Sequence, residues 1–344
     1  AMGVYGFVCA AGGSVGLLLG GVLTSALNWH WIFLVNLPIG AGVYALCMGL
    51  LPHAKVEGTH QKLDIAGAIL VTSSMMLAVY AVVNGNEVGW TSVQTLGMLG
   101  AAVVLLISFI ITEVRISTPL MPLGMFKLRN LTTANLIGVL WAAGMFAWFF
   151  ITTLYLQAVL GFTPFQIGLV FLPANLIMAA FSLGLSAKIV MRWGIRAPLA
   201  AGLLVAAIGL VLFARAPVGG GFALDVLPGM LLLGLGAGIA FNPVLLAAMS
   251  EVPVSESGLA SGVVNTSFMM GGALGLAVLA SLAAARTHGA AASGLDPAAA
   301  LAAGYHAAFI VGAAFAALAA ALGALLLRQA PARDDDAQLA THAG

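Results

Sequence analysis

The feature that most restricts the fold of this chain is a succession of long apolar runs with almost no charge inside them. A helix needs about 20 mostly apolar residues to cross the hydrocarbon core of a bilayer. Ten segments reach about this length: 2–25, 32–51, 65–84, 94–112, 133–155, 165–186, 198–214, 226–249, 259–282 and 305–327. Because these runs do not alternate and are longer than the strands of a transmembrane β-barrel, the sequence predicts an all-α membrane protein. We expect a helical bundle with about ten transmembrane helices, surrounded by a lipid bilayer.

The charge content excludes a soluble globule. Only 7% of the residues are charged, whereas a soluble domain carries about 25% charged residues to face water. The net charge of +1 gives no reason to expect a nucleic-acid partner. Cys9 and Cys47 lie inside apolar runs, which argues against a disulfide framework. We recognise no phosphate loop, metal-ligand spacing or buried nucleophile–base pair, so we predict no enzyme activity, no cofactor and no metal site.

The basic residues predict the orientation of the chain, because cytoplasmic loops of membrane proteins carry an excess of Lys and Arg. If the N-terminal end is cytoplasmic, the outer loops hold only Arg215 and Arg286. The inner connectors and tail then hold the other ten: Lys55, Lys62, Arg115, Lys127, Arg129, Lys188, Arg192, Arg196, Arg328 and Arg333. We therefore place both ends in the cytoplasm and expect the polar tail, 328–344, to be disordered.

The acidic residues all lie in connectors, at span edges or in the tail. We expect Asp64 and Asp225, at the starts of two spans, to cap helices. Glu113 lies at the inner end of the fourth span. A self-contained ion channel or proton pump would need buried charges along its path. If transport is coupled to protons, we expect the titrating group to precede this sequence. The histidines lie in loops, in the tail or, for His306, at a span edge, and we expect them to be solvated.

Uncharged polar and aromatic side chains inside the spans have two interpretations. They can bond neighbouring helices, or they can line a cavity in which aromatic rings hold a flat, apolar or cationic ligand. The fifth span favours a cavity because Trp141, Met145 and Trp148 share one helix face. The candidate cavity-lining residues are Asn135, Trp141, Met145, Trp148, Gln157, Asn175, Asn242 and Asn265. Pro173 and Pro243 are candidate gating residues, because proline frees a backbone carbonyl and bends a helix.

The first span carries a pattern of glycines, which lets another backbone approach closely. Its members are Gly3, Gly12, Gly16, Gly20 and Gly21. This pattern resembles the antiporter motif in the fifth helix of drug:proton antiporters of the major facilitator superfamily, with Leu17 in place of the motif's proline. The segment 28–40, with His30 in place of an arginine, is similar to the signature of the fourteen-helix branch.

Further resemblances to this family follow in the family's order. Residues 64–67 resemble the start of the first extra central helix, and 119–123 with Phe126 resemble the cytoplasmic segment before the C-terminal half. Residues 155–157, with Gly161, Gly168 and Pro173, resemble the junction of the ninth and tenth helices. Residues 261–265, with Gly271, Gly272 and Gly275, resemble the entry to the thirteenth helix. The resemblance covers nearly the whole chain.

The resemblance implies that the chain comprises helices five to fourteen. Because the sequence begins with Ala1 rather than Met and enters a span at once, we expect a fragment or processed chain. The implied division is 1–51 for the last two helices of the N-terminal bundle and 52–130 for two extra central helices with cytoplasmic linkers. Residues 131–327 would form a six-helix C-terminal bundle, followed by the tail 328–344.

The implied function is alternating-access export of amphipathic or cationic drugs across the bacterial cytoplasmic membrane, in exchange for protons. The glycine face of the first span would then pack tightly against the C-terminal half. A periplasmic adaptor and an outer-membrane channel are candidate partners. Two other hypotheses stay open: a transporter of one specific metabolite, and a truncated fragment that does not transport. A specific polar substrate would normally require several buried polar or charged groups.

Overall fold

The computed structural model describes residues 2–50, 64–116, 119–121, 123–253 and 256–328. These residues form helices joined by short connections, and no strand occurs among them. Eight helices are long and apolar enough to cross a membrane: Trp31–Leu50, Ile65–Gly85, Val93–Arg115, Arg129–Ala158, Arg196–Phe213, Phe222–Met249, Ser257–Ala292 and Pro297–Leu326. The other two predicted spans contain the shorter apolar helices Val15–Ala26 and Pro164–Ala180. The all-α membrane fold is therefore confirmed.

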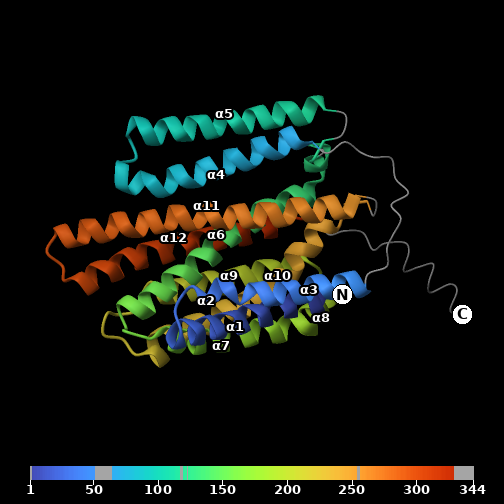
Figure 1. Cartoon of the computed structure of the whole chain (residues 1–344). Helices are drawn as coiled ribbons and strands as arrows, with labels where there is room; N and C mark the ends of the chain where they lie inside the picture. Colours follow the sequence, from blue (N-terminus) through green and yellow to red (C-terminus); the bar gives the residue numbers. More distant parts are fainter. Residues whose placement is uncertain (1, 51–63, 117–118, 122, 254–255, 329–344) are drawn as a thin grey trace, which may run out of the picture.

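Six helices form the central bundle (Figure 1). They are α6 (Arg129–Ala158), α7 (Pro164–Ala180), α9 (Arg196–Phe213), α10 (Leu227–Met249), α11 (Ser257–Ala292) and α12 (Pro297–Leu326). Within it α6 packs against α11 and α12, and α9 packs against α10 and α12. The largest fully buried side chains include Trp141 and Tyr155 of α6, Phe171 of α7, Phe213 of α9 and Phe309 of α12. The core thus lies between helices that are distant in sequence.

Glycines allow these helices to approach one another closely. A Cβ atom at Gly271 of α11 would lie 2.6 Å from the Cα of Val139 in α6. A Cβ atom at Gly234 of α10 would lie 2.8 Å from the Cα of Ala174 in α7. Both positions therefore exclude any side chain at the present helix separation. Small residues at helix contacts are how bundles pack in lipid, where apolar burial alone does not drive association.

A helical hairpin lies along the outer side of α11 (Figure 1). Its helices are α4 (Ile65–Val88) and α5 (Val93–Arg115). Asp64 caps α4 by accepting a hydrogen bond from the Gly67 N–H at 2.8 Å, which confirms the predicted cap. Ser92 caps α5 by accepting a hydrogen bond from the Thr95 N–H at 3.1 Å. Each helix of the hairpin therefore begins where a side-chain oxygen satisfies a free backbone donor.

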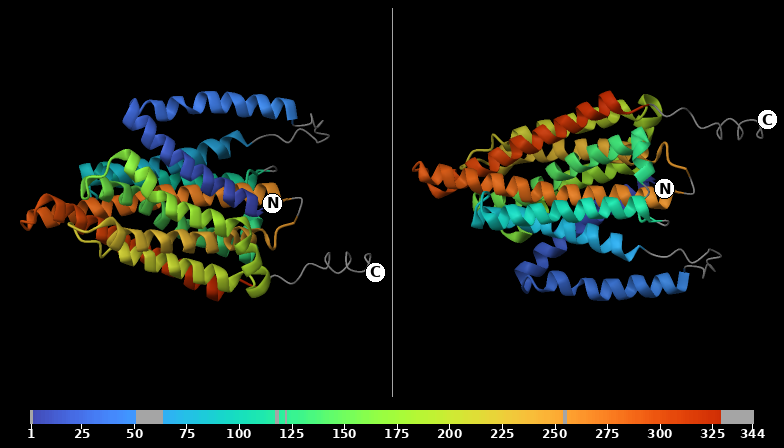
Figure 2. Two further views of the ribbon diagram at one scale, coloured as in Figure 1. Left: turned by 90° about the horizontal axis from the view of Figure 1, so that it is seen from below. Right: turned by 90° about the horizontal axis from the view of Figure 1, so that it is seen from above.

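The first helix lies against the bundle, and the next two lead the chain away from it (Figure 2). Helix α1 (Met2–Ala26) packs on α7 of the bundle, and α2 (Trp31–Leu34) turns the chain into α3 (Asn36–Leu50). None of the residues of α3 is buried. Figure 2 shows α3 apart from the bundle in both views. This apolar helix therefore has an open surface along its whole length.

The predicted spans leave two connecting segments, 187–196 and 284–304, that we expected to be loops, and both are largely helical. The predicted outer loop 284–304 is wrong, because α11 continues to Ala292 and α12 begins at Pro297. This stretch is rich in alanine, which is only mildly apolar but is the best helix former. The predicted connector 187–196 is also wrong, because α7 continues through the π-helical turn η2 (Phe181–Leu185) into α8 (Ser186–Trp193). The charges of Lys188 and Arg192 lower the hydropathy there without ending the helix.

One end of the bundle joins several helix ends and gathers basic residues. Arg129 Nε donates to the carbonyl of Leu326 at 3.0 Å, and Arg196 donates to the carbonyl of Ala324. The Asn130 side chain accepts from the N–H of Arg328 at 2.8 Å and donates to its carbonyl at 3.1 Å. The inner basic residues Arg129, Arg196 and Arg328 therefore lie at one end, which we call the basic end. Lys55, Lys62, Arg333 and the tail 329–344 lie outside the described residues.

At the end of the bundle opposite the basic end, two residues differ from their predictions. His306 is half-buried rather than solvated, and its Nε2 donates to the carbonyl of Ala216 at 2.8 Å. Asp225 is not the cap residue of α10. It lies inside the π-helical turn η3 (Phe222–Val226), where its carboxylate accepts a hydrogen bond from the Gly221 N–H at 2.8 Å. Asp225 still satisfies a backbone donor at a helix start, but from within the first turn. His53 and His60 lie outside the described residues.

Candidate functional site

A cavity of about 650 Å³ lies between α6, α7, α10 and α11, with α1 at its edge. The lining residues from α6 are Ala134, Asn135, Gly138, Trp141, Met145, Phe146 and Phe149. Those from the other helices are Gly13, Asn175, Met178, Phe241, Val244, Leu245, Met249, Ser261, Val264, Asn265, Phe268 and Met269. None of these described residues carries a charge. The volume is that of a site for one drug-sized molecule.

The spacing along α6 and α11 explains why these residues face one space. On α6 the lining side chains recur every three or four residues from Asn135 to Phe149, and on α11 they recur in the same way from Ser261 to Met269. Residues at this spacing occupy one face of an α-helix. The cavity is therefore a product of two facing stripes, one on each helix.

Five of the eight candidate cavity-lining residues lie on this cavity: Asn135, Trp141, Met145, Asn175 and Asn265. Trp148 lies one turn further along α6 and lines a small adjoining hollow together with Trp141, Met145 and Asn175. The Trp148 ring also packs edge-on against Phe171, with ring centroids 5.4 Å apart. The structure thus brings these residues of α6, α7 and α11 together.

Two candidates lie elsewhere. Gln157 is exposed in the last turn of α6 and does not line the cavity, whose last lining residue on α6 is Phe149. Asn242 is buried but does not line the cavity. Its Nδ2 donates a hydrogen bond to the carbonyl of Ser182 at 3.4 Å. Asn242 therefore joins α10 to the π-helical turn η2. Both are corrections to the predicted lining.

Several buried polar atoms around the cavity have no hydrogen-bond partner. They are Trp141 Nε1, Trp148 Nε1, Asn175 Nδ2 and Asn135 Oδ1. The Asn135 amide donates only to the carbonyl of Leu131, at 2.8 Å. An unsatisfied buried polar group costs about 1–3 kcal/mol, and natural proteins keep few of them without a reason. Trp141, Asn135 and Asn175 line the cavity and Trp148 lines the adjoining hollow, so these unsatisfied atoms, each of them buried, belong to residues of the site.

The sequence prediction missed most of the apolar wall. Phe146, Phe149 and Phe268 contribute rings, and Phe146 lies edge-on to Phe268 with centroids 6.0 Å apart. Met178, Met249 and Met269 add flexible thioether side chains, which adapt to ligands of different shape. A helical stripe drawn through Asn265 would have found Ser261, Phe268 and Met269. The α10 residues give no comparable signal, because that helix is apolar all round.

The candidate gating prolines lie on two of the lining helices. Pro173 lies inside α7, two residues before Asn175, and Pro243 lies inside α10, two residues after Phe241. The π-helical turn η2 follows α7 directly. Such turns often occur at functional sites and at helix bends. Gating by Pro173 and Pro243 stays a prediction, and the turn at Phe181–Leu185 is a feature that the sequence did not reveal.

The glycines of α1 do not pack as expected. Cβ atoms at Gly12, Gly16 and Gly20 would meet nothing within 4 Å, so the expectation that this face packs tightly on the C-terminal half is wrong for them. The contact with α7 lies on a neighbouring face. A Cβ atom at Gly21 would lie 2.7 Å from the carbonyl oxygen of Pro164. Gly3 lies on the same helix, near its start.

Gly168 completes this contact from the side of α7. A Cβ atom there would lie 3.0 Å from the carbonyl oxygen of Leu17. Leu17, which stands where the resembled motif has proline, therefore takes part in the contact through its backbone. Among the described residues, no group of three or more His, Cys, Asp or Glu side chains is placed to hold a metal ion.

Comparison with known proteins gives consistent results. The family model described as Major Facilitator Superfamily matches residues 1–276. The puromycin resistance protein of Streptomyces alboniger is 34% identical over 289 residues, which are 83% of this chain and 57% of that protein. The multidrug resistance protein Stp of Mycobacterium tuberculosis is 35% identical over 287 residues, 83% of this chain and 52% of that protein.

A third relative extends the set. The tetracenomycin C resistance and export protein of Streptomyces glaucescens is 30% identical over 286 residues, 83% of this chain and 53% of that protein. The chain thus spans about half the length of the curated relatives it matches. The names of these relatives describe resistance and export, which points to transport rather than to catalysis.

Proposed function

The chain belongs to the Major Facilitator Superfamily, and we propose that it forms the substrate-binding part of a multidrug exporter. Membership of this family supports a transporter that crosses the membrane several times. Relatives named for resistance to puromycin and to tetracenomycin C support export of drug-like compounds. The whole transporter's activity is part of this proposal, because the chain covers only about half of each of these relatives.

The observation that carries the proposal is the cavity between α6, α7, α10 and α11. Its wall is aromatic and thioether-rich, it carries no charged side chain among the described residues, and it holds polar atoms without partners at Trp141, Asn135 and Asn175. Such a wall favours flat, amphipathic molecules that stack on rings and exchange one or two hydrogen bonds. An indole face also attracts a cationic group.

The mechanism we propose is alternating access. The C-terminal bundle rocks against an N-terminal bundle, and the cavity opens to each side in turn. Pro173, Pro243 and the π-helical turn η2 would let α7 and α10 bend during this motion. Inward proton flow would drive export. These steps follow from the family resemblance, and the position of the prolines on cavity-lining helices supports them.

The finer assignment is part of the same proposal. We place the chain as helices five to fourteen of a fourteen-helix exporter in the bacterial cytoplasmic membrane. Residues 1–51 would belong to the N-terminal bundle, 52–130 to the extra central helices and 131–327 to the C-terminal bundle. The open surface of α3 and the separate position of the α4–α5 hairpin support this division. A periplasmic adaptor and an outer-membrane channel stay candidate partners.

Transport by variants of the longer protein tests the cavity. We would express the gene that encodes this chain in a strain without its own exporters. Efflux would be measured as the uptake of a fluorescent amphipathic cation into inverted membrane vesicles, whose outer surface is the cytoplasmic face. Trp141→Ala should reduce efflux at equal expression, whereas Phe150→Ala should leave it unchanged, because Phe150 is 47% exposed on the outer face of α6. Equal efflux in both variants would refute the cavity as the substrate site.

The same vesicles separate the alternatives. An imposed pH gradient should drive efflux, and efflux that ignores the gradient would refute proton antiport. A transporter of one metabolite would move a single compound and no unrelated dye. Liposomes that contain only the 344-residue chain test the third hypothesis, because a truncated fragment would give no flux where the longer protein does.

A further inference from the structure

Two carboxylates lie buried together at the open end of the α4–α5 hairpin. Asp64 precedes the first residue of α4, and Glu113 lies in the last turn of α5. Their side chains are 5% and 4% exposed, respectively. Acidic side chains are rarely buried to this degree without a partner. Neither residue lines the cavity described above, and the pair takes no part in the proposed substrate site.

Each carboxylate uses one oxygen and leaves the other without a partner. Asp64 Oδ1 accepts a hydrogen bond from the Gly67 N–H at 2.8 Å, and Glu113 Oε2 accepts one from the Met121 N–H at 3.3 Å. Asp64 Oδ2 and Glu113 Oε1 are buried and have no hydrogen-bond partner. The pair therefore presents two orphaned oxygens, one on each helix of the hairpin.

The two orphaned oxygens face the same point in space. A Cβ atom at Gly67 would collide with Asp64 Oδ2 and lie 3.2 Å from Glu113 Oε1. Only the missing side chain of Gly67 keeps this space open between them. Two ionised carboxylates at such short range, away from water, repel each other strongly. A proton between them would remove one charge and would give each orphaned oxygen a partner.

A proton fits this site better than a metal ion does. Ca²⁺ needs about six to eight oxygen ligands and Mg²⁺ a near-octahedral set, whereas two oxygens are free here. The other ionisable side chains on the described elements around this end are Arg115, Lys127 and Glu256, and all three are exposed. Water screens these exposed charges from the pair.

We propose that Asp64 and Glu113 together bind a single proton. One carboxyl group forms the O–H bond, and the orphaned oxygen of the other accepts its hydrogen bond. No other bond forms or breaks, and the proton exchanges with the aqueous phase at the end of the hairpin. The site has the chemistry of a proton-binding carboxyl pair, in which like charges cannot both persist at close range.

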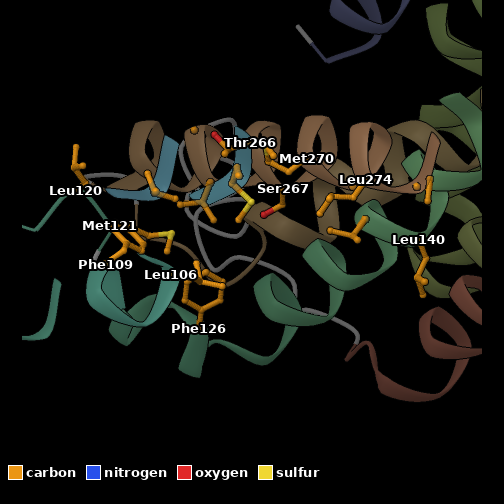
Figure 3. Close-up of a pocket in the computed structure, with 18 of the residues that line it drawn as sticks. Leu106, Phe109, Leu120, Met121, Phe126, Leu140, Thr266, Ser267, Met270 and Leu274 are labelled. Atoms are coloured by element: carbon orange, nitrogen blue, oxygen red, sulfur yellow. The ribbon is translucent and has the colours of Figure 1, made fainter. Parts of the chain in front are cut away.

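The proton would hold the hairpin end closed over a second hollow. An apolar groove of about 740 Å³ lies between the α4–α5 hairpin, α6 and α11. Phe109, one turn before Glu113, and Met121, whose N–H bonds Glu113, both line it. Figure 3 shows Phe109, Leu120 and Met121 gathered at one end of the groove and Leu140 at the other. Loss of the proton would drive Asp64 and Glu113 apart and loosen the segment 119–121 at this end.

Infrared difference spectroscopy of the full-length protein in lipid nanodiscs tests the proton directly. The wild type should show the carbonyl stretch of a protonated carboxyl group, shifted in D₂O, under conditions in which the two variants below do not. Asp64→Asn and Glu113→Gln should each lose this band. Asparagine still caps a helix and glutamine still accepts from the Met121 N–H, so both variants keep the local bonds. Asp225→Asn is the matched control and should keep the band.

Two outcomes would overturn the proposal: a wild type without the band, or a band that survives in both single variants. Hydrogen exchange of the Met121 amide gives a second readout if Asp64→Asn fails to fold. The quantity compared is the exchange rate of the Met121 amide in the wild type divided by its rate in Glu113→Gln at the same pH. This ratio should increase severalfold when the pH is raised far enough to remove the proton. A constant ratio at all pH values would also contradict the proposal. Neither measurement depends on drug transport, so failure of the proposed function leaves this test intact.

Discussion

The contact between α1 and α7 gives the sharpest test of how the bundle is held, because two glycines of α1 make opposite predictions. Gly21 lies against the first turn of α7, whereas Gly16 faces open space. Alanine at either position adds one methyl group to the same helix. The variants Gly21→Ala and Gly16→Ala therefore differ only in what that methyl group meets.

The magnitude follows from the distances. At Gly21 the methyl group would lie 2.7 Å from the Pro164 carbonyl oxygen and 3.0 Å from the Phe165 Cα, both backbone atoms that cannot turn away. To restore an ordinary contact of 3.4 Å, the helices must separate by roughly 0.7 Å, and overpacking of this kind costs about 1–3 kcal/mol. Alanine in place of a helical glycine gains about 0.5–1 kcal/mol. That gain is common to both variants and cancels in the comparison.

Thermal unfolding of the 344-residue chain in detergent, followed by tryptophan fluorescence, measures the difference. Gly16→Ala should melt at or above the wild-type temperature, and Gly21→Ala should melt about 2 °C or more below Gly16→Ala. Hydrogen exchange at the start of α7 should rise only in Gly21→Ala. Equal melting temperatures would refute the argument that Gly21, rather than the stripe at Gly12, Gly16 and Gly20, forms the contact.

Three further predictions concern single contacts. Tyr155→Phe removes the hydroxyl that donates to the Pro217 carbonyl at 2.9 Å and should lower the free energy of unfolding by about 0.5–1.5 kcal/mol; an unchanged melting temperature would contradict this. Asn130→Ala leaves the N–H of Arg328 without its acceptor at 2.8 Å, and should speed hydrogen exchange at that amide while the centre of α12 stays protected. In Gly275→Leu the new side chain would collide with Ala143 of α6, and size-exclusion chromatography should show loss of the folded protein. A Cβ atom at Gly262 meets nothing within 4 Å, so Gly262→Leu should elute normally.

Hydropathy and helix spacing were enough to predict the apolar helices and part of the cavity wall on α6. The stripe through Trp141, Met145 and Trp148 follows from the 3.6-residue period of α6, and no tertiary information is needed to place these residues on one face. The cap at Asp64 likewise follows from local chemistry. Both predictions depend on residues close in sequence, which is why they succeed.

The predictions that failed depend on contacts between residues that are distant in sequence. Which face of α1 meets α7 depends on the position of α7, so the glycine spacing could not distinguish Gly21 from Gly16. Gln157 lies near the end of its helix. Helical spacing shows which face a residue occupies, but it does not show how far along the helix the cavity extends. The partnership of Asp64 with Glu113 joins the beginning of one helix to the end of the next, and the sequence showed two separate span edges.

The cavity and the apolar groove share two of their lining helices, α6 and α11. Ser261, Asn265 and Phe268 face the uncharged cavity, while Gly262, Thr266 and Met270 face the apolar groove beside the carboxyl pair. Neighbouring residues of a helix point about 100° apart, so a rotation or shift of α11 that widens one hollow changes the other. Coupling between two sites is reciprocal in free energy. Any effect of protonation at Asp64 and Glu113 on ligand affinity in the cavity must therefore equal, in free energy, the effect of that ligand on proton binding. Helices α6 and α11 line both hollows and are the elements that could carry such an effect.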